Sequence, residues 1–166
     1  MNNSLLDLYL PAGTFAGYAQ DFFFSAVVSI AFSMLFHTPA RYLPLAGLGG
    51  ACCHLTRSLC LAADIGIVSS SFAASIVASV MFILVAPRIA VPRPVFTVAS
   101  IIPIIPGKYA YLTLLSFIHI HDNPELRQKY IGMIFENGVL TVFVMLAIGF
   151  GIAMPALLFY RSRPVV

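Results

Sequence analysis

The sequence predicts an all-helical integral membrane protein, and three observations support this fold class. Of the 166 residues, 60% are hydrophobic and only 9% are charged, whereas a soluble domain carries about 25% charged residues. The mean hydropathy is +0.97, so the chain has too few charges to cover a soluble surface. About five stretches have the roughly 17–25 mostly apolar residues that a membrane-spanning helix needs. The connections between them are short, so we expect a single transmembrane domain over residues 1–166.

The first two expected helices carry ionisable groups. The first runs from about Phe15 to Phe36 and has Asp21 near its start. The second runs from about Leu43 to Ala62 and is the most polar, with His54 and Arg57 on one face because they are three residues apart. Ionisable groups inside a membrane are costly and therefore indicate functional sites.

The third and fifth expected helices each carry a stripe of small residues. The third, Ile65–Ala86, has no charged residue, and the fifth, Ile131–Phe159, has Glu136 one turn inside its start. The stripes consist of Ser71, Ser75 and Ser79 in the third helix and of Ala147, Gly149 and Gly151 in the fifth. Because small residues let helices approach closely in lipid, we interpret both stripes as packing seams, which a partner subunit could also use.

The fourth expected helix, Val95–Phe117, is broken at its centre by a P-x-x-P-G run. Pro106 has no backbone N–H and its ring would clash with the carbonyl of Ile102, while Gly107 accepts the backbone angles of a chain break. In lipid, such a break persists only where the freed backbone groups face protein or a water-filled cavity. Transporters form binding sites from broken helices because the half-helix ends carry partial charge. The sequence therefore predicts a substrate site at this break.

The predicted substrate site combines the break with the polar face of the second helix. An arginine matches a carboxylate through its fixed fork of donors, so Arg57 is expected to hold a carboxylate substrate or an internal carboxylate, and both alternatives stay open. Lys108 either meets an anion or extends toward the membrane interface. The predicted substrate-binding residues are Arg57, Pro106, Gly107, Lys108, His54 and Tyr111.

Asp21 and Glu136 are the candidates for proton coupling. A carboxylate that is buried in the membrane can load and release a proton during transport. Each of the two lies near a helix end, so a solvated helix terminus is the alternative interpretation.

Several other function classes lack support in the sequence. The net charge of +3 comes from scattered residues, so nucleic-acid binding is not expected. The sequence contains no GxSxG, HExxH or Walker motif, so we expect no enzyme and no ATP hydrolysis in this chain. His119 and His121 precede Asp122 without a further ligand cluster, so no metal site or cofactor is expected. The three cysteines form no CxxC pair and are interpreted as reduced packing residues.

The distribution of basic residues predicts the orientation in the membrane. With five spans, one side carries Arg41, Arg88, Arg93, Arg161 and Arg163, and the other carries Arg127 and Lys129. Cytoplasmic loops are enriched in basic residues, which predicts an outside N-terminus and a cytoplasmic C-terminus. A re-entrant pair formed by the second and third stretches would change the count. Five spans cannot be divided into two equal repeats, so we expect a second chain or a homo-oligomer.

Three parts of the sequence together resemble a known family. They are the run VFTVASIIPIIPGKYAY, the polar second helix with His54 and Arg57, and the closing GIAMPALLFYRSRP. The chain resembles the threonine/serine exporter family over nearly its whole length. Within that family it is similar to the small membrane subunit of two-component members, such as the small subunit of the bacterial succinate exporter.

This resemblance implies a function and a partner. It implies an inner-membrane secondary exporter in which this chain works with a larger membrane subunit. The implied cargo is a small carboxylate, with succinate or a related dicarboxylate favoured and threonine or serine as the alternative. Pro103, Pro106, Gly107 and Tyr111 match the family's run, whereas Lys108 departs from it. The competing hypotheses are an assembly subunit without its own substrate site and a channel.

Overall fold

The computed structural model describes residues 15–88, 93–122 and 124–160, and this part of the chain contains helices and no strand. The α-helices are α1 (Phe15–Leu35), α2 (Leu43–Ala62), α3 (Ile67–Val85), α4 (Arg93–Ile101), α5 (Gly107–Asp122) and α6 (Arg127–Tyr160). Short 3-10 turns lie before or between them: η1 (Ala40–Tyr42), η2 (Ala86–Arg88), η3 (Ile102–Ile104) and η4 (Pro124–Leu126). The predicted all-helical fold is confirmed, as is the break in the fourth expected helix.

The number of candidate spans is lower than the five expected. Of the described helices, α1, α3 and α6 are long and apolar enough to cross a membrane. The segments Pro94–Ile104 and Gly107–Ile120, bent by 60° at the break, would together make a fourth. Helix α2 has 20 residues, or about 30 Å, and so has the length of a span. It does not qualify by composition, because its polar residues lower its mean hydropathy.

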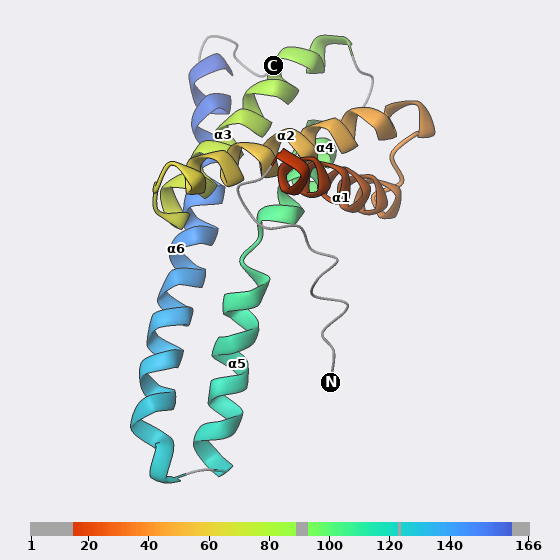
Figure 1. Cartoon of the computed structure of the whole chain (residues 1–166). Helices are drawn as coiled ribbons and strands as arrows, with labels where there is room; N and C mark the ends of the chain where they lie inside the picture. The colour runs from red at the N-terminus through yellow and green to blue at the C-terminus, as the bar shows by residue number, and fades with distance from the viewer. Residues whose placement is uncertain (1–14, 89–92, 123, 161–166) are drawn as a thin grey trace.

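The helices form two groups that run in different directions. Figure 1 shows α1 and α2 crosswise to the long axis of α5 and α6, and α1 and α2 pack closely against each other. Helix α5 and the first half of α6 form an antiparallel hairpin that extends away from the other helices, while the second half of α6 lies beside α3 (Figure 1). Because the two groups are crosswise, their helices are tilted by different amounts from any one membrane normal.

Small residues place α2 at the centre of the fold. Gly49 and Gly50 are buried and face different neighbours. A Cβ at Gly50 would overlap the Ser29 hydroxyl on α1, and a Cβ at Gly49 would overlap the Phe82 ring on α3 and the Ser100 hydroxyl on α4. These close approaches fix α2 against three helices and thereby fix the polar residues further along it.

The two stripes of small residues, predicted as packing seams, meet each other in the contact between α3 and α6. The Ser79 hydroxyl donates a hydrogen bond of 2.9 Å to the Ile152 carbonyl across this contact. A Cβ at Gly151 would overlap the Ser75 hydroxyl and would lie 2.8 Å from the Phe72 carbonyl. A Cβ at Gly149 would meet no atom within 4 Å, so this residue is not part of the seam.

The cysteines behave as packing residues, as predicted. All three are free thiols, and Cys53 is buried in the core while Cys52 and Cys60 are half-buried. The Cys53 thiol donates to the Ala74 carbonyl at 3.4 Å, which links α2 to α3 one turn before Arg57.

Candidate functional site

The broken helix and the polar part of α2 meet at a cavity of about 360 Å³. This volume falls in the range of small-molecule sites, about 300–1,000 Å³. The lining residues come from α2, the start of α3 and the break: His54, Arg57, Ser58, Leu61, Ile67, Ile105, Pro106, Gly107, Lys108 and Tyr109. Five of the six predicted substrate-binding residues are therefore together at one cavity.

The backbone changes direction at Ile105, between η3 and α5. Ile105 has φ −60° and ψ 133°, an extended conformation. In an unbroken helix the Ile104 carbonyl would accept from the N–H of Lys108, four residues later. Since the extended residue removes that donor, the Ile104 carbonyl requires another partner.

Arg57 supplies this partner from α2. Its Nη1 donates a hydrogen bond of 2.8 Å to the Ile104 carbonyl. The Nε of Arg57 is buried and has no hydrogen-bond partner among the described residues. The internal partner that the structure gives the guanidinium is thus a main-chain carbonyl of the break, whereas the internal alternative predicted from the sequence was a carboxylate.

The N-terminal end of α5 forms the other wall of the cavity. The first bond of the helix runs from the Ala110 N–H to the Pro106 carbonyl, at 3.1 Å. The N–H groups of Lys108 and Tyr109 therefore precede the helical bonding pattern and have no partner within it. Such an end carries a partial positive charge and favours anions. Pro106 is buried, whereas Gly107 and Lys108 are exposed.

His54 adds a titratable group to the cavity. Its Nδ1 lies 3.4 Å from the Ser58 hydroxyl, one turn along α2. The half-buried Asp21 on α1 is near enough for its charge to act on the His54 ring. Asp21 does not itself line the cavity. The structure therefore places Asp21 near His54 but outside the lining of the cavity.

Two predicted residues lie away from the cavity. Tyr111 is 63% exposed on α5, one turn past the break. Glu136 is exposed on α6. The aromatic residue of α5 that lines the cavity is Tyr109, two positions earlier, which the sequence did not single out.

The structure provides no metal site among its described residues. No group of three or more His, Cys, Asp or Glu side chains in that part of the chain could hold an ion. The His119 ring stacks on Tyr130 with ring centroids 5.4 Å apart, and its Nδ1 lies 2.8 Å from the Leu115 carbonyl. The ring stacking joins α5 to α6, whereas the contact with Leu115 lies within α5. The side chains of His121 and Asp122 lie outside those that the structure describes.

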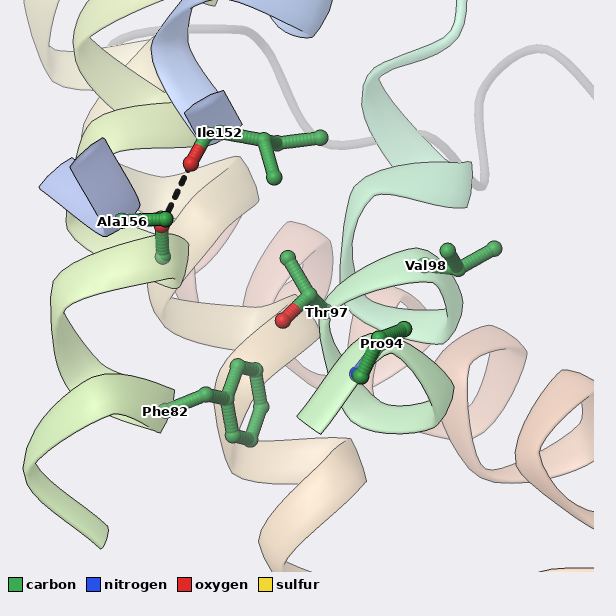
Figure 2. Close-up of a pocket in the computed structure, with 7 residues that line it drawn as sticks. Phe82, Pro94, Thr97, Val98, Ile152 and Ala156 are labelled. Carbon is green, nitrogen blue, oxygen red and sulfur yellow. Dashed lines mark hydrogen bonds between the residues drawn. The ribbon is translucent and has the colours of Figure 1, made fainter. Parts of the chain in front are cut away.

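A second, smaller cavity of about 150 Å³ lies between α3, α4 and α6 (Figure 2). Figure 2 shows the Phe82 ring and the Thr97 hydroxyl facing the space between these helices, with the hydrogen bond from Ser79 to Ile152 at its edge. Its lining residues are Ser79, Phe82, Pro94, Thr97, Val98, Ile152 and Ala156, none of which is ionisable. This cavity is therefore less suited to a charged substrate than the one at the break.

Comparison with known proteins assigns the family. A family model described as "Threonine/Serine exporter, ThrE" matches residues 21–158, which include both walls of the cavity. The chain belongs to the threonine/serine exporter family. The threonine/serine exporter family is one of membrane transport proteins. The family predicted from the sequence is thus confirmed.

A curated relative of this exporter-family chain comes from Haemophilus influenzae (strain ATCC 51907 / DSM 11121 / KW20 / Rd) and is described as "Uncharacterized protein". It is 36% identical over 146 residues, which are 88% of this chain and 49% of the relative. The chain therefore spans about half the length of the relative. No solved structure matches the chain.

Proposed function

We propose that this chain is the small membrane subunit of a secondary transporter that exports a small carboxylate across the bacterial inner membrane. Succinate or a related dicarboxylate is the favoured substrate. A larger membrane subunit is the expected partner. Family membership supports the exporter class, and the cavity at the break supports the substrate class.

The charge of the cavity is the observation that carries the substrate assignment. Arg57 and Lys108 both line it, and the positive end of α5 forms part of its wall. Its lining, among the described residues, contains no Asp or Glu. A dicarboxylate brings two negative charges to these groups. The ammonium of a zwitterionic amino acid would lack a carboxylate acceptor in the lining.

In the proposed binding mode, each part of the cavity wall has one role. The guanidinium of Arg57 holds one carboxylate through its fork of donors. The first-turn N–H groups of α5 and the Lys108 ammonium stabilise the second negative charge. His54 provides a titratable contact, with Asp21 near it as the proton-coupling candidate. Glu136, exposed on α6, is the second candidate and does not line the cavity.

The proposed partner would complete a site that is half formed here. Gly107 and Lys108 are exposed at the cavity, so its wall is open on their side. The relative from Haemophilus influenzae has about as much sequence outside the match as within it. We infer that a comparable membrane portion, on a separate chain, closes the cavity. The remaining apolar surface would contact lipid or a second copy of the chain.

The proposed orientation keeps the N-terminus outside and the C-terminus in the cytoplasm. It requires an odd number of crossings. Helices α1, α3 and α6 with the bent pair give an even number, so α2 must also cross. Its length permits this, and its polar side chains at the break would be shielded from lipid by the cavity.

Two alternative functions remain. Export of threonine or serine is favoured by the description of the family and by Asp21, whose charge acts near the cavity and could balance an ammonium group. An assembly role, in which the partner alone carries the pathway, would leave the charge of this cavity without effect on transport.

Export from cells loaded with labelled succinate or labelled threonine tests these functions. The larger subunit is co-expressed, and Arg57→Gln is compared with Arg88→Gln, since Arg88 is an exposed arginine outside the cavity. We expect succinate export to fall at least about tenfold in Arg57→Gln, because hydrogen bonds to charged groups contribute about 1.5–3 kcal/mol. If Arg57→Gln lowers the export of threonine but not that of succinate, the amino-acid alternative is favoured. Undiminished export of both would support the assembly role.

A further inference from the structure

We propose that the substrate carboxylate replaces the Ile104 carbonyl as the partner of Arg57, so that loading the cavity releases the broken end of η3. This inference rests on the proposed function and adds to it the internal group with which substrate competes. It makes Arg57 a positioning residue for the break as well as a substrate contact.

The first observation is that Arg57 is only partly satisfied in this structure. Nη1 has an acceptor at 2.8 Å, while Nε is buried without any among the described residues. A buried donor without a partner is costly. The observed arrangement therefore leaves room for a better acceptor. A carboxylate that met the side of the guanidinium formed by Nε and Nη2 would remove this cost, and turning that side toward the cavity would draw Nη1 away from the Ile104 carbonyl.

The second observation is the chemistry of the two competing acceptors. The Ile104 carbonyl is a neutral acceptor, whereas a carboxylate is charged and offers two oxygens to the guanidinium fork. Charge-assisted hydrogen bonds are roughly twice as strong as neutral ones. Arg57 lines the cavity directly, so its guanidinium can meet a substrate through a change of side-chain conformation.

The third observation is how few bonds hold the break. Pro106 has no N–H, and the extended Ile105 interrupts the helical pattern. Two local bonds remain, from the Ile105 N–H to the Ile102 carbonyl at 3.2 Å and from the Gly107 N–H to the Ile105 carbonyl at 2.8 Å. Arg57 adds a hydrogen bond from this segment to α2, beside the buried Ile104 side chain, which belongs to the same core cluster as Cys53 of α2. Losing that hydrogen bond would free the start of α5, which packs chiefly against α6, to move relative to α2.

Hydrogen exchange at the break tests this proposal. The full chain with its co-expressed partner, in lipid nanodiscs, is measured with and without succinate, with exchange resolved at the amides of Ile105 and Gly107. If Arg57 leaves Ile104, we expect both amides to exchange about fivefold faster in the presence of succinate, because each is protected by a local bond of modest strength. Arg57→Gln should show the faster exchange without succinate. Arg88→Gln, whose Nη1 lies near the Leu84 carbonyl at 3.5 Å, should match the unmodified chain.

Binding of labelled succinate to the same samples distinguishes a failure of the Ile104 replacement from a failure of the proposed function. If succinate binds in an Arg57-dependent manner but slows or leaves unchanged the exchange of both amides, the replacement of Ile104 is wrong while the proposed function stands. Absence of succinate binding to the unmodified complex overturns both. The comparison with and without succinate uses the unmodified chain, so it decides the matter even where Arg57→Gln fails to insert. Unchanged exchange within the α3 seam shows that the fold is intact.

Discussion

The Nη1 atom of Arg57 and the carbonyl oxygen of Ile104 form a hydrogen bond of 2.8 Å between residues 47 positions apart. It joins the polar face of α2 to the broken helix and brings a positive charge to the point where the backbone hydrogen-bond pattern stops. This one contact links the break to the charge that would bind an anion. Its structural setting and its proposed function can both be tested by substitution.

Restoring a backbone donor at the break should impair transport. Pro106→Ala supplies an N–H that can bond to the Ile102 carbonyl, which favours a continuous helix and changes the cavity wall. We expect succinate export per complex to fall at least about tenfold, since a small misplacement of a binding group can cost two orders of magnitude. Pro155→Ala inside α6 is the matched control and should retain export. A drop in complex yield with normal export per complex would instead support the assembly role.

Substitution of Lys108 should affect the binding of anions more than it affects the stability of the fold. Lys108→Gln removes one of the two positive side chains of the cavity, and we expect the half-saturating succinate concentration to rise about three- to tenfold, as for a partly exposed charge. Lys129→Gln on α6, also exposed and outside the cavity, is the control. Equal effects of both variants would show that Lys108 acts through net charge alone.

Gly149 and Gly151, two of the glycines of α6, should respond oppositely to substitution by alanine. Gly151→Ala places a Cβ against the Ser75 hydroxyl and the Phe72 carbonyl, so we expect a loss of roughly 1–3 kcal/mol in the free energy of unfolding. Gly149→Ala meets no atom within 4 Å and should be neutral or stabilise α6 by up to about 1 kcal/mol. Unfolding in mixed micelles measures both. Equal losses would contradict the rotation of α6 that turns Gly151, and not Gly149, toward α3.

Two buried serines, Ser79 and Ser33, should also differ in how much their replacement by alanine changes the free energy of unfolding. The Ser79 hydroxyl bonds to the Ile152 carbonyl, so Ser79→Ala should lower the free energy of unfolding by about 1 kcal/mol. The buried Ser33 hydroxyl has no partner among the described residues, so Ser33→Ala should be neutral or stabilising. The same unfolding measurement compares them. A larger loss for Ser33→Ala would show that its hydroxyl has an acceptor in the assembled protein.

The local features of the fold could be predicted from the sequence because their causes are local. Two prolines and a glycine within five positions remove donors from one helix, so the break at Pro106 was predictable. The spacing of Ser75 and Ser79 likewise predicted the seam of α3. The same spacing occurs in α1 at Ser25, Ser29 and Ser33, all buried, and applying the criterion there would have predicted the contact with α2.

Features that depend on helix rotation and on distant contacts could not be predicted. Gly149 and Gly151 are alike in sequence, and only the rotation of α6 decides which one faces α3. The same holds for Tyr109 and Tyr111 on α5, since consecutive helical positions differ by about 100°. The partner of Arg57 is a main-chain carbonyl, which no pattern of side chains could indicate. The direction of α1 and α2, crosswise to α5 and α6, equally lacks a sequence signal.

The most direct test of the central claim is the binding of labelled succinate to the purified complex, in competition with unlabelled dicarboxylate or threonine. A carboxylate site at the break predicts saturable binding that another dicarboxylate displaces, that threonine displaces weakly, and that is lost in Arg57→Gln but kept in Arg88→Gln. Binding that threonine displaces as well as succinate does, or that persists unchanged in Arg57→Gln, would contradict it.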